Sequence, residues 1–262
     1  MHSRIMSSLL ALLLLAAGRA AVADEALVKL PTRPGVTQPF WVTTPPGPPV
    51  ASVILFTGGP GLLGSQRQPV LRGKNFLIRS RDKFAAAGFL VASVDGPSDH
   101  LEGLDENFRT SAEHASDIAA VIAYLRRKAA VPVWLIGTSR GTTSAANVAA
   151  RLKSGGPDGL VLTSSIVAPT RILAPIQSSV DVGAITVPTL FVHNRDDACM
   201  ACPFSAVPAL MARFTRAPRE ELIAVSGGST PLSDPCEALS RHGYIGIEDE
   251  VVGKIAAWIK GA

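Results

Sequence analysis

One five-residue pattern, G-x-S-x-G at residues 137–141, constrains the fold of this chain more than any other feature. It follows an apolar run, 131–136, whose β-branched and aromatic residues suit a buried strand. It precedes a run of mostly small residues, 142–153, that is typical of a helix packed closely on a sheet. The pattern therefore predicts a sharp strand-to-helix turn. The glycines would let two backbones pass closely, and the Ser139 hydroxyl would stand clear of the sheet.

Other apolar runs predict strands that alternate with helices. Further strands are expected at residues 40–44, 51–56, 89–94, 160–167, 187–193 and 222–226. Further helices are expected at residues 75–87, 110–128 and 247–260, with Gly88 as a left-handed cap of the first and Thr110 with Glu113 as a capping box of the second. Because the loops between them are short, the predicted fold class is α/β, with a mostly parallel central sheet and helices on both faces.

The N-terminal residues 1–23 have the pattern of a signal peptide. A short basic stretch with Arg4 precedes an apolar run, 5–17, and Ala21-Val22-Ala23 forms a cleavage motif before Asp24. The apolar run is too short for a membrane-spanning helix. We therefore expect an exported protein, periplasmic or secreted, with one domain at 24–262 and no stable membrane anchor.

The charge of the chain argues against a nucleic-acid partner. The chain has 25 basic and 21 acidic residues, and residues 1–23 hold two arginines and no acid, so the remainder carries a net charge of +2. Its lysines and arginines do not cluster among aromatic residues. Nucleic-acid binding sites are usually marked by such a basic surface, so this class of partner is not expected.

A glycine-rich loop, Thr57-Gly58-Gly59-Pro60-Gly61, follows the strand expected at 51–56. It is not a phosphate loop, because no Gly-Lys-Ser/Thr follows at the required spacing. The backbone amides of Gly58 and Gly59 would suit an oxyanion hole if the loop lay beside the serine. The alternative is a plain tight turn.

A serine hydroxyl needs a base, and the base needs an orienting acid, in order to attack a carbonyl at neutral pH. On a sheet with this kind of turn, the three follow in the order serine, acid, histidine. Only His242 lies beyond the last strands, so it is the predicted base, with a solvated loop histidine as the alternative. Asp197, just after the strand at 187–193, is the preferred acid. Adjacent Asp196 would be solvated or paired with Arg195, and Asp181 and Asp234 are weaker alternatives.

With these features the chain resembles members of the α/β-hydrolase superfamily. The resemblance spans residues 40–262 and rests on the 137–141 turn, the Gly58-Gly59 loop, the 193–197 acid loop and His242-Gly243. The chain is most similar to compact, exported, dienelactone-hydrolase-like members. It departs from the pattern at Asn194, where glycine is usual, and at Thr57, where histidine is common. Asparagine tolerates the positive φ for which glycine is used.

The resemblance implies a serine hydrolase that cleaves an ester, thioester or activated amide of a small-molecule acyl substrate, without a cofactor or metal. Ser139 would form the acyl-enzyme, His242 would take its proton and Asp197 would hold the imidazole. The amide of Arg140, with that of Gly58 or Gly59, would form the oxyanion hole. The alternatives are a non-catalytic binding protein on the same fold and a serine peptidase, since 58–61 also resembles proline iminopeptidases.

Other residues near these motifs are expected to be structural. The interval 168–186 is too short for the helical cap of those peptidases, which predicts a minimal cap and an open site. We expect the Arg140 side chain to pair with a carboxylate under the turn rather than attract an anionic substrate. Arg109, His114 and Asp99-His100 are expected to belong to the scaffold or the rim.

Three cysteines remain in the chain: Cys199, Cys202 and Cys236. With His242 they could supply four zinc ligands, but an exported protein favours a disulfide. The preferred pair is Cys199–Cys236, with Cys202 free, because this bond would tie the loop of the predicted acid to the loop of the predicted base. Cys202–Cys236 is the close alternative.

Overall fold

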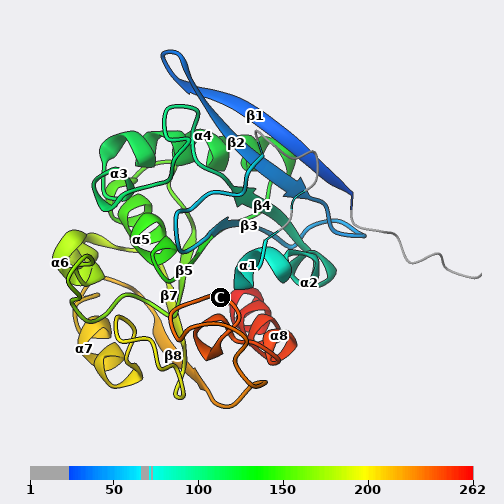
Figure 1. Cartoon of the computed structure of the whole chain (residues 1–262). Helices are drawn as coiled ribbons and strands as arrows, with labels where there is room; N and C mark the ends of the chain where they lie inside the picture. The colour runs from blue at the N-terminus through cyan, green and yellow to red at the C-terminus, as the bar shows by residue number, and fades with distance from the viewer. Residues whose placement is uncertain (1–23, 66–70, 72, 262) are drawn as a thin grey trace, which may run out of the picture.

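The computed structural model describes residues 24–65, 71 and 73–261, so the predicted signal peptide at 1–23 lies outside the described residues. One sheet runs through the molecule, with its strands in the order β1-β2-β4-β3-β5-β6-β7-β8 (Figure 1). The strands are β1 (Glu25–Arg33), β2 (Val36–Thr43), β3 (Ala51–Phe56), β4 (Phe89–Val94), β5 (Val133–Thr138), β6 (Gly159–Thr163), β7 (Thr189–Asn194) and β8 (Glu220–Val225). The helices are α1 (Phe76–Arg79), α2 (Arg81–Ala86), α3 (Glu106–Arg109), α4 (Ala112–Lys128), α5 (Gly141–Arg151), α6 (Ile176–Ser179), α7 (Val207–Met211) and α8 (Glu248–Lys260).

The sheet is mostly parallel, as predicted. Strands β4, β3, β5, β6, β7 and β8 run parallel to one another, whereas β2 pairs antiparallel with both β1 and β4. Parallel strands end at the same edge of the sheet, and active groups in such folds gather at that edge. The loops after β3, β5, β7 and β8 carry the predicted site residues there.

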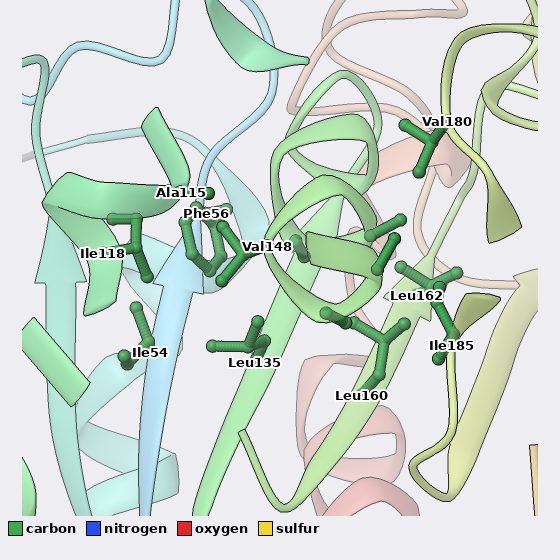
Figure 2. Packing of buried hydrophobic residues seen from close by; sticks show 14 of the residues in the cluster. Ile54, Phe56, Ala115, Ile118, Leu135, Val148, Leu160, Leu162, Val180 and Ile185 are labelled. Atoms are coloured by element: carbon green, nitrogen blue, oxygen red, sulfur yellow. The ribbon is translucent and has the colours of Figure 1, made fainter. Parts of the chain in front are cut away.

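Helices cover both faces of the sheet, which confirms the predicted α/β architecture. On one face, α4 and α5 pack over the strands, and on the other α2 and α8 do so (Figure 1). Figure 2 shows the first layer, where Ile54, Leu135 and Leu160 of the sheet lie beneath Ile118 of α4 and Val148 of α5, all fully buried. This apolar packing fixes the sheet on which the loops are held.

Strand β1 was not expected from the sequence. It lies at the edge of the sheet and is only partly buried, so it lacks the continuous apolar run of the inner strands. Pro31 also interrupts its pattern, and the pairing register with β2 shifts between Pro31 and Arg33. An edge strand tolerates a proline because one of its sides needs no backbone donor.

Two predicted helices differ in detail. The helix expected at 75–87 is divided at Ser80 into α1 and α2, and Gly88 has the expected left-handed conformation (φ 92°). The N-cap of α4 is Ser111, whose Oγ accepts the N–H of His114, so the Thr110–Glu113 capping box is wrong. The Thr110 hydroxyl instead donates to the Glu106 carbonyl and helps to end the short helix α3.

The middle of the chain differs from the expected pattern in one strand and agrees with it in one connection. Strand β6 ends at Thr163 rather than Val167, because Ser164 turns the chain at a left-handed φ of 46°. Between β6 and β7 the segment 168–186 holds only α6 and one short helical turn, which agrees with the predicted minimal cap.

His114 provides a test of this packing. It is buried in α4 between Phe56 and Phe108, and neither ring nitrogen has a hydrogen-bond partner among the described residues. Burial, assisted by the charge of Arg109, lowers the pKa of His114 from 6.5 to about 3. The unfolded chain therefore binds a proton more readily than the folded one between these two values, and stability falls as the pH drops below 6.5.

When the pH is lowered from about 7.5 to about 5, both proteins lose unfolding free energy. We expect this loss to be about 2 kcal/mol smaller in His114→Phe than in the wild type. Phenylalanine keeps the ring contacts and cannot titrate. Urea unfolding of both proteins at the two pH values measures the difference. Equal losses in the two proteins would show that His114 is not held neutral by the fold.

Candidate active site

Ser139 sits in a strained turn between β5 and α5. Its backbone has φ 54°, a left-handed value that is uncommon outside glycine. A Cβ on Gly137 would lie 2.5 Å from the Gly141 carbonyl oxygen, and one on Gly141 would lie 2.1 Å from that of Phe56. Gly137 is therefore needed where β5 meets the start of α5, and Gly141 where α5 starts against the end of β3. This local geometry is the one that the G-x-S-x-G pattern predicts.

The loop after β3 lies directly against Ser139. A Cβ on Gly58 would lie 2.8 Å from the Ser139 Cβ and 3.4 Å from its Oγ. Gly59 has φ 57°, so the backbone changes direction there. Within the described residues, the N–H groups of Gly58, Gly59 and Arg140 donate to no acceptor. Unused amides in the residues next to the serine suit a developing oxyanion.

Asp197 and His242 are joined by a hydrogen bond. The His242 Nδ1 lies 2.8 Å from Asp197 Oδ2, and both side chains are buried. The other carboxylate oxygen, Oδ1, accepts the Cys199 N–H at 2.9 Å. With the carboxylate as acceptor, Nδ1 carries the hydrogen, so Nε2 is left as the basic nitrogen of the neutral ring.

Ser139 and His242 line one cavity of about 230 Å³, together with Gly58 and Gly59. Among the described residues, His242 Nε2 has no hydrogen-bond partner, so the serine–histidine hydrogen bond is not formed in this structure. Such bonds are often long before substrate binds. The structure thus brings all three predicted residues to one edge of the sheet and couples two of them directly.

Two residues that the sequence did not single out hold the His242 loop. Tyr244, fully buried, donates its hydroxyl to the Val192 carbonyl of β7 at 2.7 Å. The Ser164 Oγ lies 2.9 Å from that hydroxyl and 2.8 Å from the His242 carbonyl oxygen. Tyr244 also has a left-handed φ of 58°. Aromatic and serine side chains are too common for this network to be recognised from sequence.

Asp95 was also missed, and it holds the segment that follows the glycine-rich loop. It follows β4, and its carboxylate accepts the N–H groups of Leu63 (2.6 Å), Ser65 (2.8 Å) and Gly96 (2.8 Å). These bonds restrain the segment strongly, because moving the amides away would leave the buried Asp95 carboxylate without partners, which costs free energy. Its place at the carboxyl end of a parallel strand was the available signal.

The remaining polar residues of the site have structural contacts. The Arg140 side chain pairs with Glu106 at 2.7 Å, the arrangement expected for a carboxylate under the turn. Asp196 accepts the Gly227 N–H, and Arg195 lies over the Phe204 ring. His193 is buried and accepts the Ser165 N–H at Nε2, and burial, with a smaller effect of nearby His242, lowers the pKa of His193 to about 3.

Cys199 and Cys236 form a disulfide, the preferred pairing, and Cys202 is a buried free thiol. Burial raises the pKa of Cys202 well above its usual value, and the nearby Asp197 adds to this effect. The ligand atoms of Cys199, Cys202 and His242 lie within 4.8 Å of one another. However, zinc binds cysteine as the thiolate, and Cys199 is part of the disulfide. Cys199, Cys202 and His242 therefore do not form the ligand set of a zinc site in this oxidised state.

Removing the disulfide is expected to cost stability. The bond joins residues 37 apart, and closing a loop of that length stabilises a fold by about 4 kcal/mol in the chain-entropy model. We expect Cys199→Ser/Cys236→Ser to lose roughly that amount of unfolding free energy in urea, because the bond ties the loops of Asp197 and His242 together. Cys202→Ala, which keeps the disulfide, is the control. An unfolding free energy equal to that of the control would contradict this account.

No family model and no curated protein matches the sequence of this chain. Solved structures do match its fold. An esterase from an Arctic intertidal metagenomic library matches with a TM-score of 0.62 at 16% identity, covering 91% of this chain and 95% of the other. An esterase of Pyrococcus furiosus matches with a TM-score of 0.63 at 14% identity, covering 91% of both chains.

A third match is an α/β serine hydrolase from Xanthomonas campestris that has no lid. Its TM-score is 0.58 at 14% identity, with 90% of this chain and 94% of that chain covered. The likeness therefore extends over nearly the whole length of each neighbour. This protein has the α/β-hydrolase fold.

Proposed function

We propose that the protein is a serine hydrolase that cleaves an ester, thioester or activated amide through an acyl-enzyme on Ser139. The observation that carries the proposal is the Asp197–His242 hydrogen bond beside a cavity into which the strained Ser139 turn opens. Structural neighbours that are esterases and serine hydrolases support the same chemistry. The dienelactone-hydrolase-like subtype stays a prediction.

The chemistry uses the contacts described above. The Ser139 oxygen attacks the acyl carbon while His242 Nε2 takes the hydroxyl proton, and Asp197 stabilises the imidazolium through Nδ1–H. The imidazolium then gives its proton to the leaving alcohol, thiol or amine, and the acyl-enzyme remains. A water molecule attacks this ester with His242 again as base, which releases the acid and restores Ser139.

The oxyanion would be held by the amides of Arg140 and of Gly59 or Gly58. The unused N–H groups of Gly59 and Arg140 support this role, as does the N-terminal end of α5, whose dipole favours negative charge. We expect these amides to stabilise the tetrahedral intermediate with little rearrangement of the loop.

The substrate we propose is a small molecule with a short acyl group, because the cavity formed by the described residues holds about 230 Å³. The disulfide supports export to an oxidising compartment, periplasmic or extracellular. Among the helices of the described residues, none combines the length and the apolar character needed to cross a bilayer.

A substrate panel tests the proposal. Purified protein is assayed with nitrophenyl esters of increasing acyl length, the matching thioesters, and aminoacyl anilides. We expect turnover of the short esters, slower turnover as the acyl chain lengthens, and little cleavage of the anilides. Turnover of anilides alone would indicate the serine peptidase, and binding of these compounds without any turnover would indicate the non-catalytic protein.

A further inference from the structure

Two arginines hold the same carbonyl group of the glycine-rich loop. The Gly59 oxygen accepts Nη2 of Arg109 at 3.1 Å and Nη1 of Arg140 at 3.0 Å. Gly59 has a left-handed φ, and Pro60 follows it. Because proline has no N–H, the peptide group between Gly59 and Pro60 can be anchored only through the Gly59 oxygen. The only anchors of this peptide within the described residues are the two guanidinium groups.

Arg109 is unusual because it is a buried cation without a carboxylate partner among the residues that the structure describes. Only 1% of the residue is exposed. Its other described partners are the Leu104 carbonyl (3.2 Å), the Ser144 hydroxyl (3.0 Å) and the Arg140 carbonyl (3.4 Å), all neutral. Burial, and then the charge of Arg140, lower the pKa of Arg109 to about 10, so it stays charged at neutral pH.

The partners of Arg109 belong to both sides of the proposed oxyanion hole. It contacts the carbonyl of Gly59 on one side and that of Arg140 on the other, and the N–H groups of both residues, like that of Gly58, donate to no acceptor among the described residues. Arg140 is fixed in turn by Glu106 of α3 and by the Leu104 carbonyl. Gly61 leaves room for this arrangement, since a Cβ there would lie 2.6 Å from Arg109 Nη2.

We propose that Arg109, assisted by Arg140, is a positioning residue that sets the distance between the two oxyanion-hole amides. The proposal rests on the proposed function of the site. Neither guanidinium needs to touch the substrate, because each acts through the backbone carbonyl of a residue whose amide does. The glycines at 58, 59 and 61 make the loop adaptable, and the arginines remove that freedom.

The test compares Arg109→Lys and Arg109→Met with the wild type on a short nitrophenyl ester. Both variants are expected to lose about 100-fold in kcat with KM nearly unchanged, because displacing the amides affects the transition state more than substrate binding. Lysine keeps the charge but cannot reach both carbonyls at once. Arg140→Lys, on the more exposed side, is expected to lose about tenfold.

A transition-state analogue separates positioning from general stability. The dissociation constant of a trifluoromethyl ketone with the same acyl group should rise by the factor by which kcat/KM falls in each variant. Arg126→Met is the control, because Arg126 also donates to a backbone carbonyl, that of Gly156. Arg126 lies away from the cavity, since its other partner, Asp158, accepts the Val133 N–H at the start of β5. It should keep wild-type kcat and inhibitor affinity.

Three outcomes distinguish the explanations. If folded Arg109→Lys keeps wild-type kcat and inhibitor affinity, the positioning role is wrong. If Arg109→Met does not fold, the kinetics of Arg140→Lys provide the test. A wild-type kcat in Arg140→Lys would also overturn the proposal. If the wild type neither turns over esters nor binds the ketone, the proposed hydrolase function fails instead, whatever the arginines do.

Discussion

Replacing Ser139 with alanine is expected to lower kcat for a short ester about a millionfold. The hydroxyl is the group proposed to form the acyl-enzyme, and a methyl group cannot replace it. The substitution leaves the cavity, the proposed oxyanion amides and the Asp197–His242 pair unchanged. Only the slow hydrolysis that these groups support without a nucleophile should remain. Steady-state assays with enough enzyme to detect slow turnover measure the loss.

The fold of Ser139→Ala is expected to stay intact. Alanine meets the same strain as serine at φ 54°, and the Ser139 Oγ makes no hydrogen bond with any residue that the structure describes, so little stability is lost with it. Unfolding of the variant should occur near the wild-type temperature. A variant that retained more than about one per cent of wild-type turnover would show that another residue is the nucleophile.

Replacing Asp197 with asparagine is expected to lower kcat about 10⁴-fold. The carboxylate accepts Nδ1–H of His242 at one oxygen and the Cys199 N–H at the other. An amide that keeps the bond to Cys199 presents its NH₂ group to the imidazole. His242 would then take the other tautomer, with its hydrogen on Nε2, and could no longer accept the serine proton.

Asp196→Asn provides the matched control for this prediction. Asp196 is adjacent in sequence and exposed, and its carboxylate accepts the Gly227 N–H rather than a group of the cavity. We expect this variant to keep kcat near the wild-type value. A large loss in Asp196→Asn together with a small one in Asp197→Asn would reverse the assignment of the acid.

Much of the fold was predictable because its signals are local. The inner strands are continuous apolar runs, and Gly137 has a local steric cause, because a Cβ there would meet the Gly141 carbonyl, whereas Gly141 is needed because it lies against the Phe56 carbonyl of β3. The sequence order of serine, acid and histidine follows from the topology of such a sheet. The structure places Ser139, Asp197 and His242 at one edge of it.

What the sequence could not predict depends on contacts between distant segments. Strand β1 is held by its pairing with β2 and by Asp117 of α4, which binds Arg33, so its own residues carry a weak signal. Tyr244, Asp95 and Arg109 act through partners many residues away. Only the folded arrangement shows which of several similar side chains is buried beside a loop.

Covalent labelling with a fluorophosphonate probe tests the central claim most directly, because the probe reacts with a serine only when a base and an oxyanion hole activate it. We expect one phosphonyl group per chain, located by peptide mass spectrometry on Ser139, and none in Ser139→Ala. An unlabelled wild-type protein, or equal labelling of the alanine variant, would contradict it.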